Sequence, residues 1–335
     1  MELDHQSKAL RLGAWAIALA LILRLADLGC FRPVLRWFSQ PNTQSFLIYL
    51  ETGRNVRFSA SYDSPANSLG ESAVPVLSEP EPVLPVYSRQ DSTQILYACS
   101  LRPDTQALLE QPLTWDLTGP EPKVLILHTH ATESYTRQGE DYEESSAFRT
   151  LDTQYNLVSV GEQVAQILQN AGITVIHDRT LHDYPSYNGS YNHARKSIQQ
   201  ILKENPEICL VLDLHRDASG DLKNQFRPVV SSDRGDVAQI MLVMGTNAGG
   251  QAHPHWQENL SLGLKIQAQL ERQLPGITRS TSLRSQRFNQ DLTPGSLLIE
   301  MGAAGNTHAE ALRAAEELAR AIIALSRGTG QHPGE

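Results

Sequence analysis

The sequence predicts an α/β fold, a mostly parallel sheet flanked by helices, preceded by an N-terminal transmembrane helix and a disordered linker. From Lys123 onward, short apolar runs alternate with segments of helical periodicity, which is typical of a parallel sheet covered on both faces. Histidines and carboxylates follow several of the apolar runs, at the edge where such sheets place their sites. The length of 335 residues suggests about two domains.

The predicted strands are short apolar runs, and the predicted helices carry apolar residues at helical spacing. We expect strands at 124–130, 173–178, 208–215, 239–245 and 296–302. We expect helices at 156–172, 192–204, 256–274 and 307–326. Gly172 suits the C-cap of the first of these helices, because glycine readily adopts the left-handed conformation that ends many helices.

The N-terminal segment favours a retained membrane anchor. Residues 12–23 are uninterrupted apolar between Arg11 and Arg24. The longer stretch 9–28 reaches the roughly 20 residues that a membrane span needs, with charged side chains only near its ends. A signal peptide and a buried amphipathic helix are the alternatives. Basic residues flank both sides, so their distribution does not fix the orientation.

A segment of biased composition follows the anchor. Residues 59–90 are rich in Pro, Ser and Glu and have no sustained helical period. Such a segment cannot bury enough surface to offset its loss of chain entropy, so we expect a semi-extended linker. The chain is therefore divided into an anchor at 1–35, a juxtamembrane segment and linker at 36–120, and a globular domain at 121–328.

Composition and motifs exclude several classes of protein. The formal net charge of -9 argues against a general nucleic-acid binder. The three cysteines lie far apart and form no CxxC, so neither a disulfide scaffold nor a cysteine metal site is supported. The sequence contains no GxSxG elbow, no Walker A motif and no GxGxxG after a strand.

Histidines and acidic residues gather where three of the predicted strands end. The first strand leads to His128, His130 and Glu133, the third to Asp213, His215, Arg216 and Asp217, and the last to Glu300. Zinc hydrolases need such a set, because three nitrogen or oxygen ligands leave one position open for water. A nearby carboxylate can then accept the proton of that water. The pattern therefore favours a metal site at this edge of the sheet.

These residues also have structural interpretations, which stay open at this point. His128 is favoured as a hydrogen-bonded core histidine, His215 could be structural, and Glu300 could cap the next segment or pair with an arginine. Asp213, Asp217 and Glu300 could instead form a carboxylate pair of the glycosidase type. The histidines would then lack a role.

A series of motifs carries a family resemblance. The motifs are HTHATESY (128–135), NLVSVGEQVAQIL (156–168), HDYPSYNGSY (182–191), LDLHRDA (212–218), HWQENL (255–260), FNQDL (288–292) and LLIEMGAAGNTHAEA (297–311). Over roughly 123–323, the chain resembles the stage II sporulation protein P family, membrane-anchored cell-wall hydrolases related to zinc-dependent N-acetylmuramoyl-L-alanine amidases. The resemblance implies the α/β fold of those amidases.

The resemblance also implies a reaction and a ligand set. The enzyme would cut the bond between the lactyl group of muramic acid and L-alanine in peptidoglycan, and the family is also credited with cutting the peptide cross-link. Zinc (Zn2+) would be held by His130, Glu133 and His215, with Glu300 acting on the water. The acidic ligand of the amidases falls in a register near Asp152, so Asp152 remains an alternative to Glu133.

Further residues are assigned to catalysis and substrate binding. Arg216 is expected to steady the oxyanion or to hold a stem-peptide carboxylate, and Asp217 to orient a ligand histidine. The loop at 182–191 is expected to lie over the substrate groove. The residues assigned to substrate, with two amides from a later loop, are His182, Asp183, Tyr187, Tyr191, Asn289 and Gln290. A surface salt bridge for Arg216 and local turn contacts for His182 and Asn289 are the structural alternatives.

The family's setting implies partners and a location. Peptidoglycan is the expected substrate, stage II sporulation proteins D and M are the expected partners, and no nucleic acid is expected. The protein would cross the cell membrane once, with its catalytic domain extracytoplasmic at the septum around a forming spore. Two rival hypotheses remain: a zinc carboxypeptidase acting on wall peptides, and a non-catalytic wall-binding scaffold. The scaffold would predict loss of His130, His215 or Glu300, and all three are present.

Overall fold

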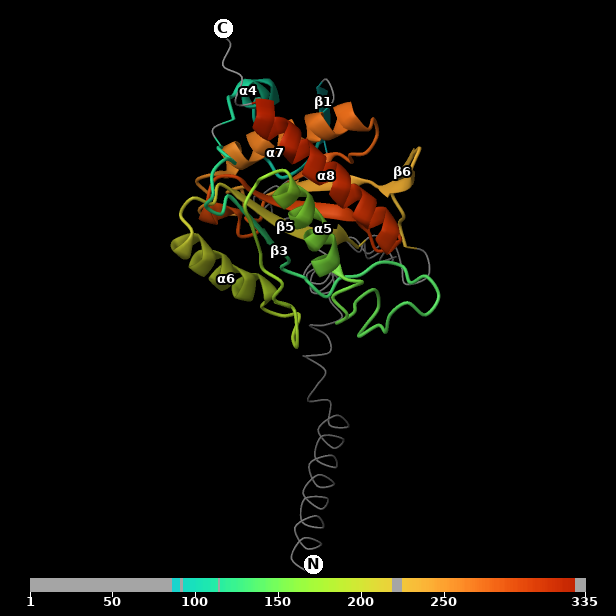
Figure 1. Ribbon diagram of the computed structural model, residues 1–335. Coiled ribbons are helices and arrows are strands. Elements are labelled where there is room, and N and C mark those ends of the chain that lie inside the picture. Colours follow the sequence, from blue (N-terminus) through green and yellow to red (C-terminus); the bar gives the residue numbers. More distant parts are fainter. Residues whose placement is uncertain (1–85, 91–92, 114, 219–224, 329–335) are drawn as a thin grey trace, which may run out of the picture. The chain divides into compact units, whose positions relative to one another are not determined.

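The computed structural model describes residues 86–90, 93–113, 115–218 and 225–328 (Figure 1). The chain divides into two compact units, Met1–Leu77 and Ser78–Glu335, and the described ranges all belong to the second. The predicted anchor at 1–35, and the predicted linker up to residue 85, lie outside the described residues. Within the described ranges, no helix has the length and apolar character of a membrane span.

Strands and helices alternate along most of the second unit. The strands are β1 (Val86–Gln90), β2 (Thr93–Ala98), β3 (Val124–Leu127), β4 (Val175–His177), β5 (Leu210–Asp217), β6 (Val229–Ser232), β7 (Gly235–Ala238), β8 (Ile240–Met244), β9 (Thr281–Arg284) and β10 (Ser296–Ala303). The helices are α4 (Thr105–Glu110), α5 (Leu157–Asn170), α6 (Ser190–Glu204), α7 (Trp256–Gln273), the 3-10 turn η1 (Gln290–Leu292) and α8 (His308–Gly328). Every strand and helix expected from the sequence is present within a few residues of its expected bounds.

The main sheet of the described residues has eight strands in the order β1-β2-β9-β8-β10-β5-β3-β4. The prediction of an α/β fold with a mostly parallel sheet is confirmed, because only β1–β2 and β8–β10 pair antiparallel. Since β8 runs against β10, and β9 and β2 run with β8, these three strands begin at the edge where β3, β4, β5 and β10 end. That edge carries the candidate site.

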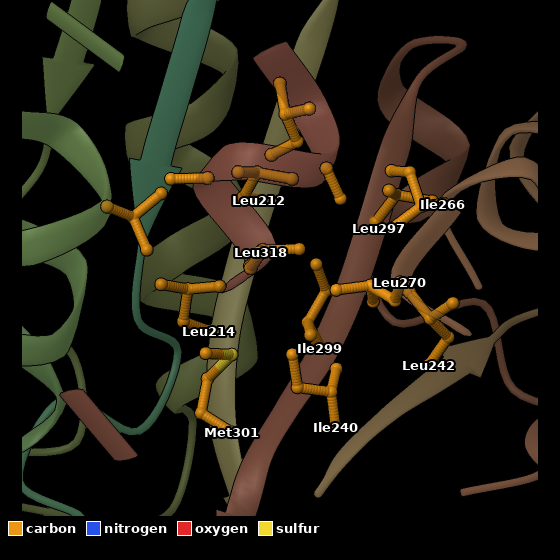
Figure 2. Close-up of a cluster of buried hydrophobic side chains, with 14 of the residues drawn as sticks. Leu212, Leu214, Ile240, Leu242, Ile266, Leu270, Leu297, Ile299, Met301 and Leu318 are labelled. Carbon is orange, nitrogen blue, oxygen red and sulfur yellow. The ribbon is translucent and has the colours of Figure 1, made fainter. Parts of the chain in front are cut away.

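Both faces of the central strands carry buried apolar side chains, and alternation along each strand decides which side chain lies on which face. Figure 2 shows Leu212 and Leu214 of β5 and Ile299 of β10 pointing into the core, together with side chains of β8, α7 and α8. Helices α5, α7 and α8 cover this face, and α6 covers the opposite face. Because neighbouring residues of a strand point to opposite faces, His215 and Glu300 lie on the α6 side of the sheet.

Helix α5 shows how local chemistry fixes an element. Its apolar residues recur at helical spacing and are buried against the sheet. The side chain of Asn156 caps the start by accepting a hydrogen bond of 2.9 Å from the backbone N–H of Val158. Gly172 follows the end with a φ of 87°, a conformation that glycine adopts without strain. The predicted role of Gly172 is therefore confirmed.

The globular domain begins earlier than the predicted boundary at residue 121. Strand β2 pairs with β9 in the main sheet, and β1 pairs with β2, although both lie within the predicted juxtamembrane and linker segment. Buried and exposed residues alternate along β2, and Ile95 and Tyr97 enter the core. Six residues of alternating pattern next to a Pro-rich segment are too short a signal to identify this strand from the sequence.

Candidate functional site

The three strands that carry the predicted site residues are neighbours in the sheet. Strand β5 lies between β10 and β3. In the parallel pairing of β10 with β5, Glu300 is the register partner of His215, so their side chains lie side by side on the same face. The loops that follow these strands therefore meet at one edge, as the sequence predicted for parallel strands.

The two histidines of the HTH motif have different surroundings. Strand β3 ends at Leu127, so the strand alternation that would place both rings on one side does not continue. His128 is completely buried, with Nε2 2.9 Å from His177 Nε2 and Nδ1 3.2 Å from the carbonyl oxygen of Leu214. His130 lies with its ring centre 5.3 Å from that of His215. His128 is thus a core histidine, and His130 belongs to the site.

His215 lies between two carboxylates. Its Nε2 is 3.0 Å from Asp213 Oδ1, and its Nδ1 is 3.9 Å from Glu133 Oε2. Asp213 also accepts hydrogen bonds from the backbone N–H and the hydroxyl of Thr129. Burial acts to lower the pKa of His215, but the Asp213 carboxylate outweighs burial and raises the pKa to about 9. Asp213 therefore favours charge, or a bound cation, at this ring.

The two candidate acidic ligands differ in position. Glu133 is buried, and its Oε2 accepts a hydrogen bond of 3.2 Å from the backbone N–H of Arg216. Its Oε1 lies 3.3 Å from Nη2 of Arg149. Asp152 is exposed, and its Oδ1 accepts from the backbone N–H of Gln154 in a local turn. Of the two carboxylates, only that of Glu133 lies against His215.

Glu300 is a carboxylate that the fold leaves unsatisfied. Its Oε2 is buried and has no hydrogen-bond partner in the part of the chain that the structure describes. Burial raises the pKa of Glu300 to about 8, against the opposing effect of the positive charge on His215. A carboxyl group with a pKa close to neutrality can accept and return a proton under physiological conditions.

Arg216 and Asp217 contact other groups than those expected. The Nε of Arg216 donates to the carbonyl oxygen of Ser134, and its Nη2 donates to that of Phe148, both at 2.9 Å. Its guanidinium thus holds the loop that carries Glu133. Asp217 pairs with Arg279 at 2.7 Å, and Asp213 instead takes the position against His215.

The loop after β4 covers His130. The ring of Tyr187 stacks on His130 with centres 4.5 Å apart, and Tyr191 meets the same ring edge-on at 5.5 Å. Asp183 accepts hydrogen bonds from the backbone and the hydroxyl of Thr132. His182 faces Asp178, with 3.2 Å between Nε2 and Oδ2. Tyr187 and Tyr191 therefore contact the site directly, and the contacts of Asp183 and His182 stabilise the loops.

The side-chain amides of Asn289 and Gln290, predicted to bind substrate, form hydrogen bonds with the backbone of the protein instead. Gln290 is buried, its Oε1 accepts from the N–H of Gly245, and its Nε2 donates to the carbonyl oxygen of Val243. Asn289 donates to the carbonyl oxygen of Tyr191 at 2.8 Å. Asn289 thereby positions Tyr191, and Gln290 ties η1 to the end of β8.

The sequence comparisons identify the family. Residues 77–323 match the family model described as stage II sporulation protein P. The chain belongs to this family. The stage II sporulation protein P of Bacillus subtilis (strain 168) is 26% identical over 214 residues, which cover 60% of this chain and 50% of that protein. The chain thus spans about half the length of this relative.

Solved structures similar to this stage II sporulation protein P family member are N-acetylmuramoyl-L-alanine amidases. The CwlD amidase of Clostridioides difficile, solved in complex with the GerS lipoprotein, is 15% identical, with 62% of this chain and 99% of that chain covered and a TM-score of 0.38. An N-acetylmuramoyl-L-alanine amidase of Clostridium difficile 630 is also 15% identical, with 64% and 99% covered and a TM-score of 0.37.

The donor set in this family member has the chemistry that zinc requires. Among the described residues, no three His, Cys, Asp or Glu side chains lie close enough together to enclose a metal ion. Zinc–nitrogen bonds of about 2.0–2.1 Å would place the centres of two coordinating imidazoles about 5 Å apart, close to the 5.3 Å between His130 and His215. One nitrogen of each ring contacts an oxygen of the fold, from Ser190 and Asp213 respectively. The contact with Ser190 leaves Nε2 of His130 for a metal, whereas in His215 Nε2 makes no hydrogen bond among the described residues and Nδ1 faces Glu133.

Arg149 is a site residue that the sequence did not reveal. Its guanidinium contacts Asp183 at 2.8 Å and Glu133 at 3.3 Å, and it lies 4.7 Å from the centre of the Tyr187 ring. It thus connects the candidate acidic ligand to the loop over His130. No motif marks it, because its partners come together only when the 143–150 segment folds against the strand ends.

Proposed function

We propose that this chain is a zinc-dependent peptidoglycan hydrolase with N-acetylmuramoyl-L-alanine amidase activity that acts in sporulation. The observation that carries the proposal is the buried pairing of His215 with Glu300 on adjacent strands, next to His130 and Glu133. Two imidazoles and one carboxylate can hold the metal in a zinc hydrolase, and a second carboxylate can act as the general base. Membership of the stage II sporulation protein P family supports a role in sporulation.

We assign the metal ligands as His130, Glu133 and His215. The exposure of Asp152 and the burial of Glu133 beside His215 support this choice of acidic ligand. Zinc, when bound, would polarise the scissile carbonyl and lower the pKa of water. Asp213 would hold the ring of His215 in place and increase its basicity as a ligand.

Glu300 would move the proton in this reaction. Its carboxylate would accept the proton of the attacking water and then return it to the leaving amine of L-alanine, because it lies beside His215 with a buried oxygen that makes no hydrogen bond among the described residues. Tyr187 and Tyr191 exclude water from one face of His130 and offer aromatic surface to the substrate. The contacts of Arg216 with loop carbonyls support a positioning role for this arginine instead of an oxyanion role.

The rest of the proposal concerns the setting. An anchor at 1–35 and a linker would hold the domain outside the cytoplasm near the wall, with stage II sporulation proteins D and M as partners. The family's sporulation role supports this arrangement.

The test uses the full chain in detergent, with zinc measured by elemental analysis and muropeptide products by mass spectrometry. We expect one zinc per chain and release of intact stem peptides. Glu300→Gln should keep its zinc and lose activity by about 10²–10⁴-fold, the range for a general acid–base group. Glu207→Gln, on an exposed carboxylate at the other end of β5, should keep full activity.

The products separate the alternatives. Peptides that stay attached to muramic acid while cross-links disappear would replace the amidase by a peptidase. If the chain binds no zinc and cleaves nothing, even with stage II sporulation protein D present, the proposal is overturned and a wall-binding scaffold remains.

A further inference from the structure

A second arginine lies at the site edge of the sheet, on the far side of Glu300 from His130. Arg279 lies two residues before the start of β9 at Thr281. Strand β9 runs with β8 and against β10, so its first residues lie at the edge where β5 and β10 end. The backbone N–H of Arg279 donates to the carbonyl oxygen of Ile240 at 2.8 Å, which fixes its place beside β8.

The guanidinium of Arg279 is held on one side and unsatisfied on the other. Its Nη2 donates to Asp217 Oδ2 at 2.7 Å. Asp217 is two residues beyond His215 on the same strand, and therefore on the same face. The Nη1 of Arg279 is buried and has no hydrogen-bond partner among the described residues. A buried N–H group without an acceptor costs free energy, so a ligand that supplies an acceptor oxygen to Nη1 would be favoured here.

An exposed aromatic ring lies against this arginine. The guanidinium carbon of Arg279 is 5.1 Å from the centre of the Phe226 ring, and Phe226 is 44% exposed. The backbone at Phe226 is held by Gly305, in the turn after β10, through a hydrogen bond of 3.2 Å from the Gly305 N–H. A Cβ atom at Gly305 would lie 2.5 Å from the carbonyl oxygen of Phe226, so only glycine allows this approach. A single exposed phenylalanine is ordinary, but this one is fixed beside an unsatisfied donor.

The opposite flank of the site provides a comparison. There, Arg149 lies against Tyr187 in the same way. The guanidinium of Arg149 contacts Asp183, Thr132 and Glu133, all within the fold. Both flanks thus pair an aromatic ring with an arginine, but Arg279 alone of these two arginines retains a buried donor without an acceptor.

We propose that Arg279 and Phe226 form a subsite that binds a carboxylate of the peptide part of the substrate. The planar guanidinium matches a carboxylate, and the ring covers the adjoining apolar part of the peptide. A singly charged carboxylate fits better than a doubly charged phosphate, because the guanidinium of Arg279 is already paired with the Asp217 carboxylate. This inference rests on the proposed function, since it names the part of the substrate that the site recognises.

The experiment compares two probes on the full zinc-loaded chain. One probe is a muramoyl stem peptide with free carboxylates, and the other is the same peptide with its carboxylates converted to carboxamides. Arg279→Gln should raise the KM for the carboxylate probe by about 10–100-fold with kcat nearly unchanged, and should leave the carboxamide probe unaffected. Arg279→Lys should keep only part of the preference for the carboxylate probe, because the compact ammonium group lacks the two parallel N–H donors of a guanidinium. Phe226→Ala, on an exposed ring, should keep the fold and weaken both probes several-fold.

A matched control and a binding readout make the outcomes distinct. Arg234→Gln removes an exposed arginine that pairs with Glu316 and Glu317 elsewhere, and should change neither probe. Equal losses on both probes in Arg279→Gln, or no loss, would overturn the subsite while leaving the amidase intact. Fluorescence anisotropy measures the binding of both labelled probes to Glu300→Gln, and so tests the subsite independently of cleavage. A carboxylate preference in binding, without cleavage by the wild-type chain, would overturn the amidase and keep the subsite.

Discussion

Two pairs of histidines lie near the same edge of the sheet and have opposite electrostatic character. In the first pair, His128 and His177 approach to 2.9 Å between their Nε2 atoms, beneath helix α5. Burial, followed by the neighbouring His177, lowers the pKa of His128 to about 3. In the second pair, His130 and His215 are 5.3 Å apart between ring centres, and buried carboxylates adjoin His215. The pKa of His215 rises to about 9.

The difference shows that neighbouring charge, and not the residue type, decides what a strand-end histidine does. Both HTH histidines follow the same buried strand, yet only His130 reaches the side of the sheet where Asp213 and Glu133 lie. The first pair is neutral and packed, and its nearest carboxylate, on Glu162, is half exposed. In the second pair only His215 is adapted to positive charge, because burial, followed by the charge of His215, lowers the pKa of His130 well below its ordinary value. The following predictions test this contrast, from the largest effect to the smallest.

Removing the carboxylate from each pair should have very different effects. Asp213→Asn removes the charge that raises the pKa of His215 and weakens the hold on its ring, so zinc affinity should fall about 10–100-fold. Glu162→Gln, at the other pair, should change zinc affinity by less than about twofold, since Glu162 contacts His177 and Arg179, which lie outside the assigned ligand set. Competition with a fluorescent zinc chelator measures both. Similar losses in the two variants would mean that the pairs do not differ in function.

Gly161→Ala tests the packing of the first pair. A Cβ atom at this position would lie 2.6 Å from His128 Nε2 and 2.7 Å from His177 Nε2, so the two rings would have to move. Overpacking of this kind typically costs about 1–3 kcal/mol of unfolding free energy. Denaturant unfolding measures it, with Gly263→Ala in helix α7 as the comparison, because the atom nearest to the added Cβ there is the sulfur of the flexible Met244 side chain, at 3.1 Å. The two variants should have equal zinc affinity, and a loss confined to Gly161→Ala would show that the pairs are coupled.

His128 and His215, one from each pair, should also give the metal-free protein opposite pH dependences. The folded-state pKa of His128 lies below its ordinary value of 6.5, so its contribution to stability is complete above pH 6.5 and falls as the pH drops towards 3. The folded-state pKa of His215 lies above 6.5, so its contribution is complete below pH 6.5 and is lost as the pH rises through 9. Each slope is at most about 1.4 kcal/mol per pH unit.

Chemical denaturation across this pH range measures both slopes. His128→Asn should flatten the acid limb, and His215→Asn should flatten the alkaline limb. Unchanged slopes in both variants would show that other groups control the pH dependence.

The sequence predicted the parts of the fold that long apolar runs encode. Strands β3, β5 and β10 and helices α5, α7 and α8 were found because their patterns extend over enough residues. Strand β2 and the direction of β8 were not predictable, since pairing partners are chosen by the folded sheet. The same reason explains the site. His215 and Glu300 lie within long apolar strands and His130 lies shortly after β3, so the sequence could place them at one edge, whereas the partners of Arg149 and Arg279 are distant in sequence.

Glu300 lies on β10, a central strand between β5 and β8, and not on one of the outermost strands, β1 and β4. A buried carboxylate oxygen without a partner among the described residues is unfavourable for folding. Selection for folding alone would therefore tend to replace this residue, in the way that functional residues often trade stability for activity. In evolutionary terms, a lineage that no longer needed the reaction should lose Glu300 early, while Leu298 and Ile299 beside it persist for as long as the domain folds.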